Sequence, residues 1–161
     1  MLVSNLSTLI LIAKISALSK FLDRAKKIVT TEVVYDEILK KDSFENSIIK
    51  KEVKNGRIII DHIQTSQYSG ITGQFRLDGG EASTFALYMT KRHEGILTDD
   101  KELIKVCRIE QIKFVSSMAI ILMLFKRNII GKSEALEKLE MLQGYGRFSN
   151  EIYEYFKNKV K

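Results

Sequence analysis

The stretch GILTDDKELIKVC, residues 95–107, indicates the fold class most clearly, because in it a buried strand is followed directly by a helix. The strand is predicted at Ile96–Thr98, two aspartates follow it, and the helix is predicted to begin at Asp100. The same order opens the chain, where a strand predicted at Met1–Ser4 precedes a helix with the sequence LILIAKISALSKFL at residues 9–22. The recurring unit is therefore a strand followed by a helix.

Strand and helix patterns alternate about five times along the sequence. Further strands are predicted at 27–30, 57–60 and 112–115, and further helices at 31–41, through 48–53, and at 81–89, 118–126, 136–142 and 152–160. This alternation predicts an α/β fold with a central parallel sheet of about five strands, right-handed crossovers and helices on both faces. Residues 64–77 have weak periodicity and two glycines, and they are predicted to form a loop. Ser7 or Thr8 is the expected N-cap of the first helix.

The length and composition predict one domain. The chain has 161 residues, of which 45% are hydrophobic and 29% charged, and a single domain typically has roughly 150 residues. These values are those of a globular protein and exclude a disordered or collagen-like chain. We expect a single domain over residues 1–161, with the C-terminal helices from about residue 132 packed on the core.

Membrane and disulfide-based classes are disfavoured. The longest apolar run is Met118–Phe125, and a bilayer span needs roughly 20 residues. The first twelve residues have no leading positive charge, so a secretory signal is not expected. One cysteine, Cys107, excludes an internal disulfide and a cysteine-rich zinc site. We expect a cytoplasmic protein without a membrane partner.

The charge favours a polyanionic partner. Lysine and arginine exceed acidic residues to give a net charge of +6 and a pI of about 9.3. The basic residues that flank the acidic motifs in sequence are Arg76, Lys91, Arg92, Lys101, Lys105 and Arg108. Solvated helix faces explain such residues by default, but Arg76, Lys101 and Arg108 are our candidates for RNA binding. If they bind phosphates, binding will weaken steeply with salt.

Polar residues follow the predicted strands where a parallel sheet binds ligands, at the carboxyl ends. They are Asn5, Glu37, Glu81, Asp99 and Asp100. If the fold brings them together, their mutual repulsion calls for a hard cation, and Mg²⁺ or Mn²⁺ accepts carboxylate and amide oxygens.

Each of these residues also has a structural explanation. Glu81 is at the start of a helix, where its charge suits the macrodipole, and Asp99 can cap the helix that follows it. Glu37 can be a solvated helix residue, and Asn5 a turn former. The functional interpretation therefore depends on the whole set.

Four segments carry a resemblance to a known family when they are taken in order. They are VSNLSTLILIAKISAL at 3–18, EVVYDEIL at 32–39, LDGGEASTFALY at 77–88 and GILTDDKELIKVC at 95–107. Together they resemble the PIN-domain family of metal-dependent ribonucleases, in particular a VapC-toxin-like branch with Asn at the first acidic position. FKRNIIGKSEAL at 125–136 and GYGRFSNEIYEYF at 144–156 are similar to that branch as well. The resemblance implies a PIN-like three-layer α/β/α sandwich.

The resemblance also implies roles for individual residues. Asn5 and Ser7 correspond to the family's first Asp-x-Ser motif, with Ser7 supporting the first ligand. Glu37 and Glu81 match two further acidic positions. The Thr-x-Asp motif falls at Thr98 to Asp100, with Asp99 as a supporting ligand at its variable position.

The implied activity is hydrolysis of RNA with Mg²⁺ or Mn²⁺, leaving 5′-phosphate and 3′-hydroxyl ends. The implied biology is the toxin of a toxin–antitoxin pair, a homodimer whose small antitoxin protein blocks the site.

Asn5 departs from the family pattern and leaves a second function open. Its amide oxygen can coordinate a cation but carries no charge, so cation binding should be weaker. The alternative is a catalytically weakened PIN-like domain that binds RNA or another protein. A third class, phosphoryl-transfer enzymes, places its key Asp after the first strand, and Asn5 disfavours it.

Overall fold

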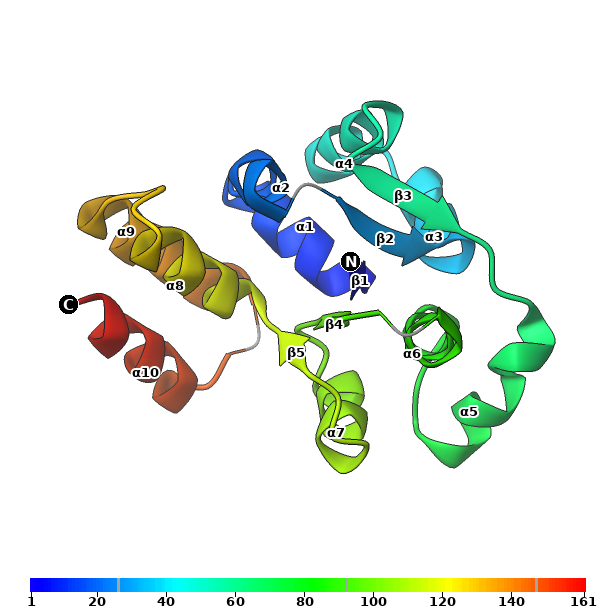
Figure 1. Ribbon diagram of the computed structural model, residues 1–161. Coiled ribbons are helices and arrows are strands. Elements are labelled where there is room, and N and C mark those ends of the chain that lie inside the picture. The colour runs from blue at the N-terminus through cyan, green and yellow to red at the C-terminus, as the bar shows by residue number, and fades with distance from the viewer. Residues whose placement is uncertain (26, 92, 147) are drawn as a thin grey trace.

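The computed structural model describes residues 1–25, 27–91, 93–146 and 148–161, and its centre is a five-stranded sheet. All strand pairs are parallel and the order is β3-β2-β1-β4-β5 (Figure 1). The strands are β1 (Leu2–Ser4), β2 (Ile28–Thr31), β3 (Ile58–Asp61), β4 (Gly95–Leu97) and β5 (Phe114–Val115). The predicted α/β fold with about five parallel strands is confirmed.

The strands form because both faces of the sheet are covered, and successive side chains enter different cores. In β4, Ile96 packs with the helices on one face and Leu97 with those on the other. In β2, Ile28 belongs to the large core that contains Leu97, while its neighbour Val29 packs against Leu87 on the opposite face. A strand buried on both sides needs continuous apolar residues, as the sequence has.

Helices cover the two faces unequally. The large core includes residues of α1 (Leu6–Lys14), α2 (Leu18–Ala25), α4 (Phe44–Lys54) and α8 (Ser117–Lys126). On the other face lie α6 (Gly79–Lys91) and α7 (Lys101–Ile109) (Figure 1). The helix α3 (Glu32–Lys40) follows β2 and packs against both α6 and α1.

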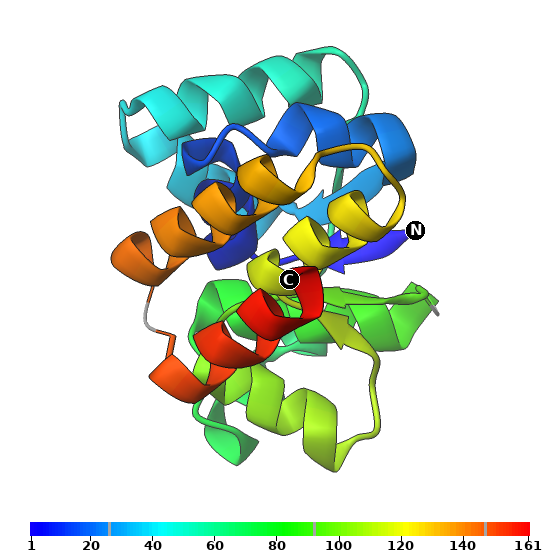
Figure 2. The same cartoon turned by 90° about the vertical axis from the view of Figure 1, so that its left-hand side faces the viewer.

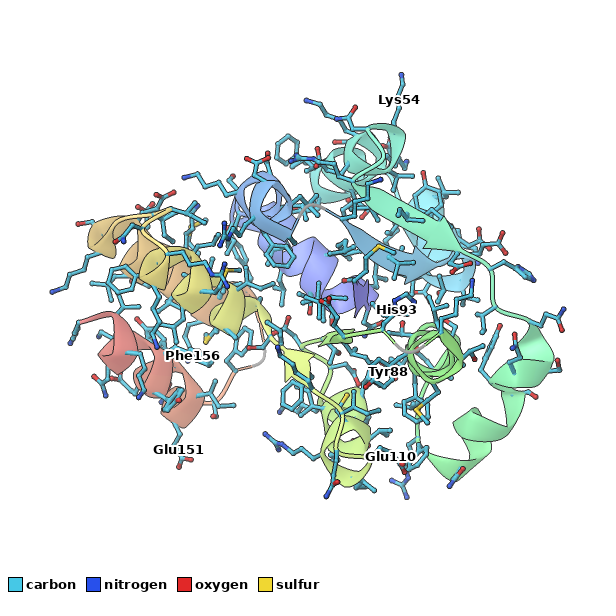
Figure 3. The ribbon with its side chains drawn as sticks, viewed as in Figure 1. Lys54, Tyr88, His93, Glu110, Glu151 and Phe156 are labelled. Atoms are coloured by element: carbon cyan, nitrogen blue, oxygen red, sulfur yellow. The ribbon has the colours of Figure 1, made fainter. Side chains whose placement is uncertain are left out.

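Two C-terminal helices extend the large core. They are α9 (Lys132–Tyr145) and α10 (Asn150–Val160), and both pack against α8 (Figure 2). Phe156 lies between α10 and the α8–α9 pair (Figure 3) and belongs to the apolar residues that pack on this core. None of the helices within the described ranges is long and apolar enough to cross a membrane.

The prediction of a loop at 64–77 was wrong. The segment contains a 3₁₀ turn, Thr65–Gln67, and a short helix, α5 (Ser69–Gln74). The helix forms despite its glycines because the chain on both sides of it is anchored: Tyr68 and Phe75 pack against the core beneath α6 and α7. Tertiary packing of this kind outweighs weak helix propensity.

The predicted single helix over 9–22 is two helices, and its start was also misplaced. The chain adopts a left-handed conformation at Ser16, with φ of 59°, which ends α1 before α2 begins. The buried Lys138 donates to the carbonyl of Ile15 at 2.6 Å and so stabilises the break. Asn5, and neither Ser7 nor Thr8, occupies the N-cap position, and its side chain makes no capping hydrogen bond.

Candidate functional site

The candidate site lies where the direction of the strand order reverses, between β1 and β4. Ser4 of β1 is paired with Leu97 of β4, and the backbone N–H of Asn5 donates to the carbonyl of Leu97 at 2.9 Å. Asn5 and the pair Asp99–Asp100 therefore leave neighbouring strands at the same edge. In parallel sheets this reversal opens a crevice in which ligands bind.

One small pocket of about 200 Å³ gathers most of the predicted site residues. Its polar lining consists of Asn5, Ser7, Glu37, Asp78, Glu81 and Asp100. Four of these side chains are carboxylates, and no Lys or Arg of the described chain lines the pocket. The structure thus brings together Asn5, Glu37, Glu81 and Asp100, which lie far apart in sequence.

Asp78 is the member of this pocket that the sequence reasoning missed. It precedes α6 and forms a reciprocal pair with Glu81: Asp78 Oδ1 accepts from the Glu81 N–H at 2.7 Å, and Glu81 Oε2 accepts from the Asp78 N–H at 3.1 Å. This is a capping box, which fixes the start of a helix. The spacing D-x-x-E at 78–81 was the sequence signal for it. The helix accordingly begins at Gly79 and not at Glu81, as predicted.

Asp100 is held in place by its own helix and by the preceding threonine. Its Oδ1 accepts from the N–H of Leu103 at 2.9 Å, so Asp100, and not Asp99, is the N-cap of α7. Its N–H donates to Thr98 Oγ1 at 3.0 Å. Burial, followed by a hydrogen bond from Glu81 to Asp100, raises the pKa of Glu81 to about 8. Two carboxyl groups this close favour sharing a proton, or binding a cation.

Glu37 reaches the pocket from α3. Thr31 caps this helix, since its hydroxyl accepts from the N–H of Val34. Burial raises the pKa of Glu37, the charge of Asp78 raises it further, and Lys40 opposes them. A Cβ at Gly80 would lie 3.0 Å from Glu37 Oε1, so an alanine there would require this carboxylate to shift by a few tenths of an ångström.

Asp99 does not line the acidic pocket, because its carboxylate is directed to other helices. Its Oδ2 accepts from the hydroxyl of Thr8 at 2.6 Å. Its Oδ1 accepts from the N–H of Ser117 at 3.1 Å and from the Ser117 hydroxyl at 2.9 Å. Burial raises the pKa of Asp99, and these donors counter the rise. Ser7 Oγ accepts from the Asp99 N–H at 3.3 Å, so its observed partner is Asp99 and not Asn5.

The predicted RNA-binding residues are spread over several surfaces. Lys101 is exposed beside Asp100, and Arg76 is exposed two positions before Asp78. Arg108 lies at the other end of α7, with its guanidinium 5.7 Å from the ring centre of Phe114. Of the remaining basic residues considered, Lys91 pairs with Asp61, Lys105 pairs with Glu102, and Arg92 lies outside the described residues.

The donor chemistry of the pocket suits a hard divalent cation. Within the described ranges, no group of three or more His, Cys, Asp or Glu side chains is arranged so that it could hold a metal ion. Mg²⁺ does not need such a cage, because it commonly keeps several waters and takes one or two protein carboxylates. Glu37, Asp78, Glu81 and Asp100, with the amide of Asn5, are the residues that would hold it.

The comparison with family models identifies the chain. The model of the PIN domain matches residues 1–161, so the chain belongs to the PIN-domain family. PIN domains are generally nucleases and generally use divalent metals. No curated protein and no solved structure matches the chain.

Proposed function

We propose that the chain is a Mg²⁺- or Mn²⁺-dependent endoribonuclease that hydrolyses RNA phosphodiester bonds. The observation that carries the proposal is the pocket in which Asn5 and four carboxylates meet, at the strand edge where α/β proteins bind ligands. The family supports the reaction class, because PIN domains are generally nucleases.

Each polar side chain of the pocket has a role in the proposed cation binding. Glu37, Glu81 and Asp100 supply the anionic ligands, Asp78 adds a fourth carboxylate, and Asn5 adds a neutral oxygen. When bound, the divalent cation supplies Lewis acidity toward water and the scissile phosphate. The hydrogen bond from the Leu103 N–H holds the Asp100 carboxylate, and Thr98 Oγ1 holds the Asp100 backbone by accepting from its N–H. The capping box holds the Glu81 carboxylate. A ligand set held this firmly needs little reorganisation during the reaction.

The test is cleavage of single-stranded and structured RNA with Mg²⁺, Mn²⁺ or a chelator. Asp100→Asn retains an N-capping side chain but loses a charge, and we expect cleavage to fall at least about 100-fold. Asp36→Asn is the matched control, because Asp36 is an exposed aspartate on α3 next to Glu37. Cleavage that survives the chelator, or that survives Asp100→Asn, would contradict the proposal.

A catalytically weakened domain is the second candidate, and Asn5 is the reason to keep it. With an amide in place of a carboxylate, the first acidic position of the family pattern that the chain resembles has no charge. Asn5→Asp should increase cleavage or lower the Mn²⁺ concentration required. An unchanged rate and an unchanged Mn²⁺ requirement would argue against a role for Asn5 in cation binding.

We further propose that the nuclease is the toxin of a cytoplasmic toxin–antitoxin pair and acts as a homodimer. This proposal rests on the resemblance to the VapC-like branch. A neighbouring reading frame for a short DNA-binding protein, whose product binds this chain and stops its cleavage, is the expected finding. An isolated gene whose product is harmless when expressed would contradict it.

A further inference from the structure

A second pocket, of about 450 Å³, opens directly beside the acidic one. Ser7, Ile10 and Asp100 line both pockets, so the two adjoin each other. The larger pocket lies between α1, the start of α7, the end of α9 and the residues Gly146 and Phe148. A molecule bound there would contact Asp100 at one end.

The walls of this larger pocket differ in chemistry from the acidic pocket. Two exposed cations line it, Lys14 at the end of α1 and Lys101 at the start of α7. Of the acidic residues in its lining besides Asp100, Asp99 is hydrogen-bonded to Thr8 and Ser117, and Glu102 pairs with Lys105. Two aromatic side chains line it as well, Tyr145 and Phe148. Positive charge combined with aromatic rings matches a nucleotide, whose phosphate is anionic and whose base is flat.

The ring of Tyr145 is exposed at this pocket and can stack on a base. Its side chain is 53% exposed at the end of α9, and Lys14 Nζ lies 5.1 Å from the ring centre. This cation–π contact keeps the positive charge of Lys14 beside the exposed ring, where it can bind the phosphate of a stacked nucleotide. Gly146 follows, and a Cβ there would overlap the Phe148 ring, so this glycine allows the ring to close against the backbone.

We propose that this pocket is a nucleotide subsite of the nuclease, in which Tyr145 stacks on an unpaired base next to the scissile phosphate. Lys14 and Lys101 bind the flanking phosphates. The RNA passes Ser7 and Asp100, which line both pockets, to reach the acidic pocket. The proposal rests on the proposed ribonuclease function. It adds a stacking residue and a requirement for single-stranded RNA at this position.

The test measures RNA binding in the presence of chelator, where cleavage does not interfere. The probe is a fluorescein-labelled adenosine RNA hexamer at low salt, followed by anisotropy, with a 12-base-pair RNA duplex for comparison. Tyr145→Ala should weaken hexamer binding about tenfold, as loss of one base–aromatic stack does, and should leave duplex binding unchanged. Tyr145→Phe keeps the stacking face and should bind like the wild type.

The chain offers a matched control at Tyr155. This tyrosine is 56% exposed on α10, and Lys159 Nζ lies 5.5 Å from its ring centre, so it repeats the Tyr145 arrangement away from the two pockets. Tyr155→Ala should change hexamer binding less than about twofold. Equal losses for the two alanine variants overturn the subsite, as does a wild-type chain that does not bind the hexamer.

The subsite and the nuclease activity can fail separately. If Tyr145→Ala weakens hexamer binding but the wild type cleaves no RNA with Mn²⁺, the subsite is supported and the proposed function fails. If the wild type cleaves RNA and Tyr145→Ala binds and cleaves normally, the subsite is refuted and the nuclease is retained.

Discussion

Replacing Glu81 by glutamine should stabilise the metal-free protein, and the gain should depend on pH. The pKa of Glu81 is raised from 4.5 to about 8, first by burial and then by its hydrogen bond to Asp100. At neutral pH the unfolded chain therefore has an ionised Glu81, whereas the folded chain must protonate this group. The glutamine of the variant has no charge to neutralise, and its amide oxygen still completes the capping box with Asp78.

The size of the effect follows from linkage. Between the unfolded pKa of 4.5 and pH 7, the raised pKa of Glu81 corresponds to at most about 3 kcal/mol. Because Glu81 is only half-buried, solvent screening reduces this to about 1–2 kcal/mol. A raised carboxyl pKa contributes stability that is present below the unfolded pKa and is lost as the pH rises. The wild type and Glu81→Gln should therefore be equally stable near pH 4, and the difference between them should grow up to about pH 8.

Thermal unfolding with chelator at pH 4, 6 and 8, followed by circular dichroism, measures the difference. At pH 8, Glu81→Gln should melt about 2–8 °C above the wild type, given about 2–4 °C per kcal/mol for a chain of this size. Glu140→Gln, at an exposed site on α9, makes the same change in charge and should show no such trend with pH. Glu81→Gln that melts lower than the wild type at pH 8, or by the same margin at every pH, refutes the reasoning.

Three further predictions concern contacts around the site. Asp99→Ala removes the acceptor for Ser117 and should cost about 3 kcal/mol, seen as a fall in Tm of about 6–12 °C; a stable variant would contradict the structural role. Gly80→Ala should displace the Glu37 carboxylate and lower Mn²⁺-dependent cleavage about tenfold in a folded chain, and unchanged kinetics would refute the close contact. Lys14→Gln should reduce the slope of log affinity against log salt for single-stranded RNA by about 0.7, whereas an unchanged slope means that Lys14 binds no phosphate.

The sheet could be predicted because its determinants are local. Each strand is a short apolar run followed at once by a helical pattern, as in residues 95–107, and parallel pairing follows from that order. The same logic predicted that Asn5 and Asp100 follow strands at the carboxyl edge of the sheet, and they meet because the structure pairs β1 with β4. Glu37 and Glu81 were predicted through the family resemblance together with their helix positions.

The features that the sequence did not predict depend on contacts with side chains that are far away in the sequence. The break after α1 requires Lys138, which reaches Ile15 from a helix 123 positions away. The carboxylate of Asp99 is turned away from the acidic pocket by Thr8 and Ser117, neither of which is its neighbour in sequence. Sequence patterns give the position of such residues along the chain but not the partner that each side chain selects.

The proposed activity requires a divalent cation in the acidic pocket, bound by one or two of the carboxylates of Glu37, Glu81 and Asp100, and a Mn²⁺-soaked crystal can show it. We expect an anomalous difference peak in the 200 Å³ pocket, at about 2 Å from at least one of these carboxylates. The peak should be missing from crystals of Asp100→Asn soaked in the same way. A wild-type crystal with no peak there, or with Mn²⁺ only elsewhere on the surface, would contradict the account.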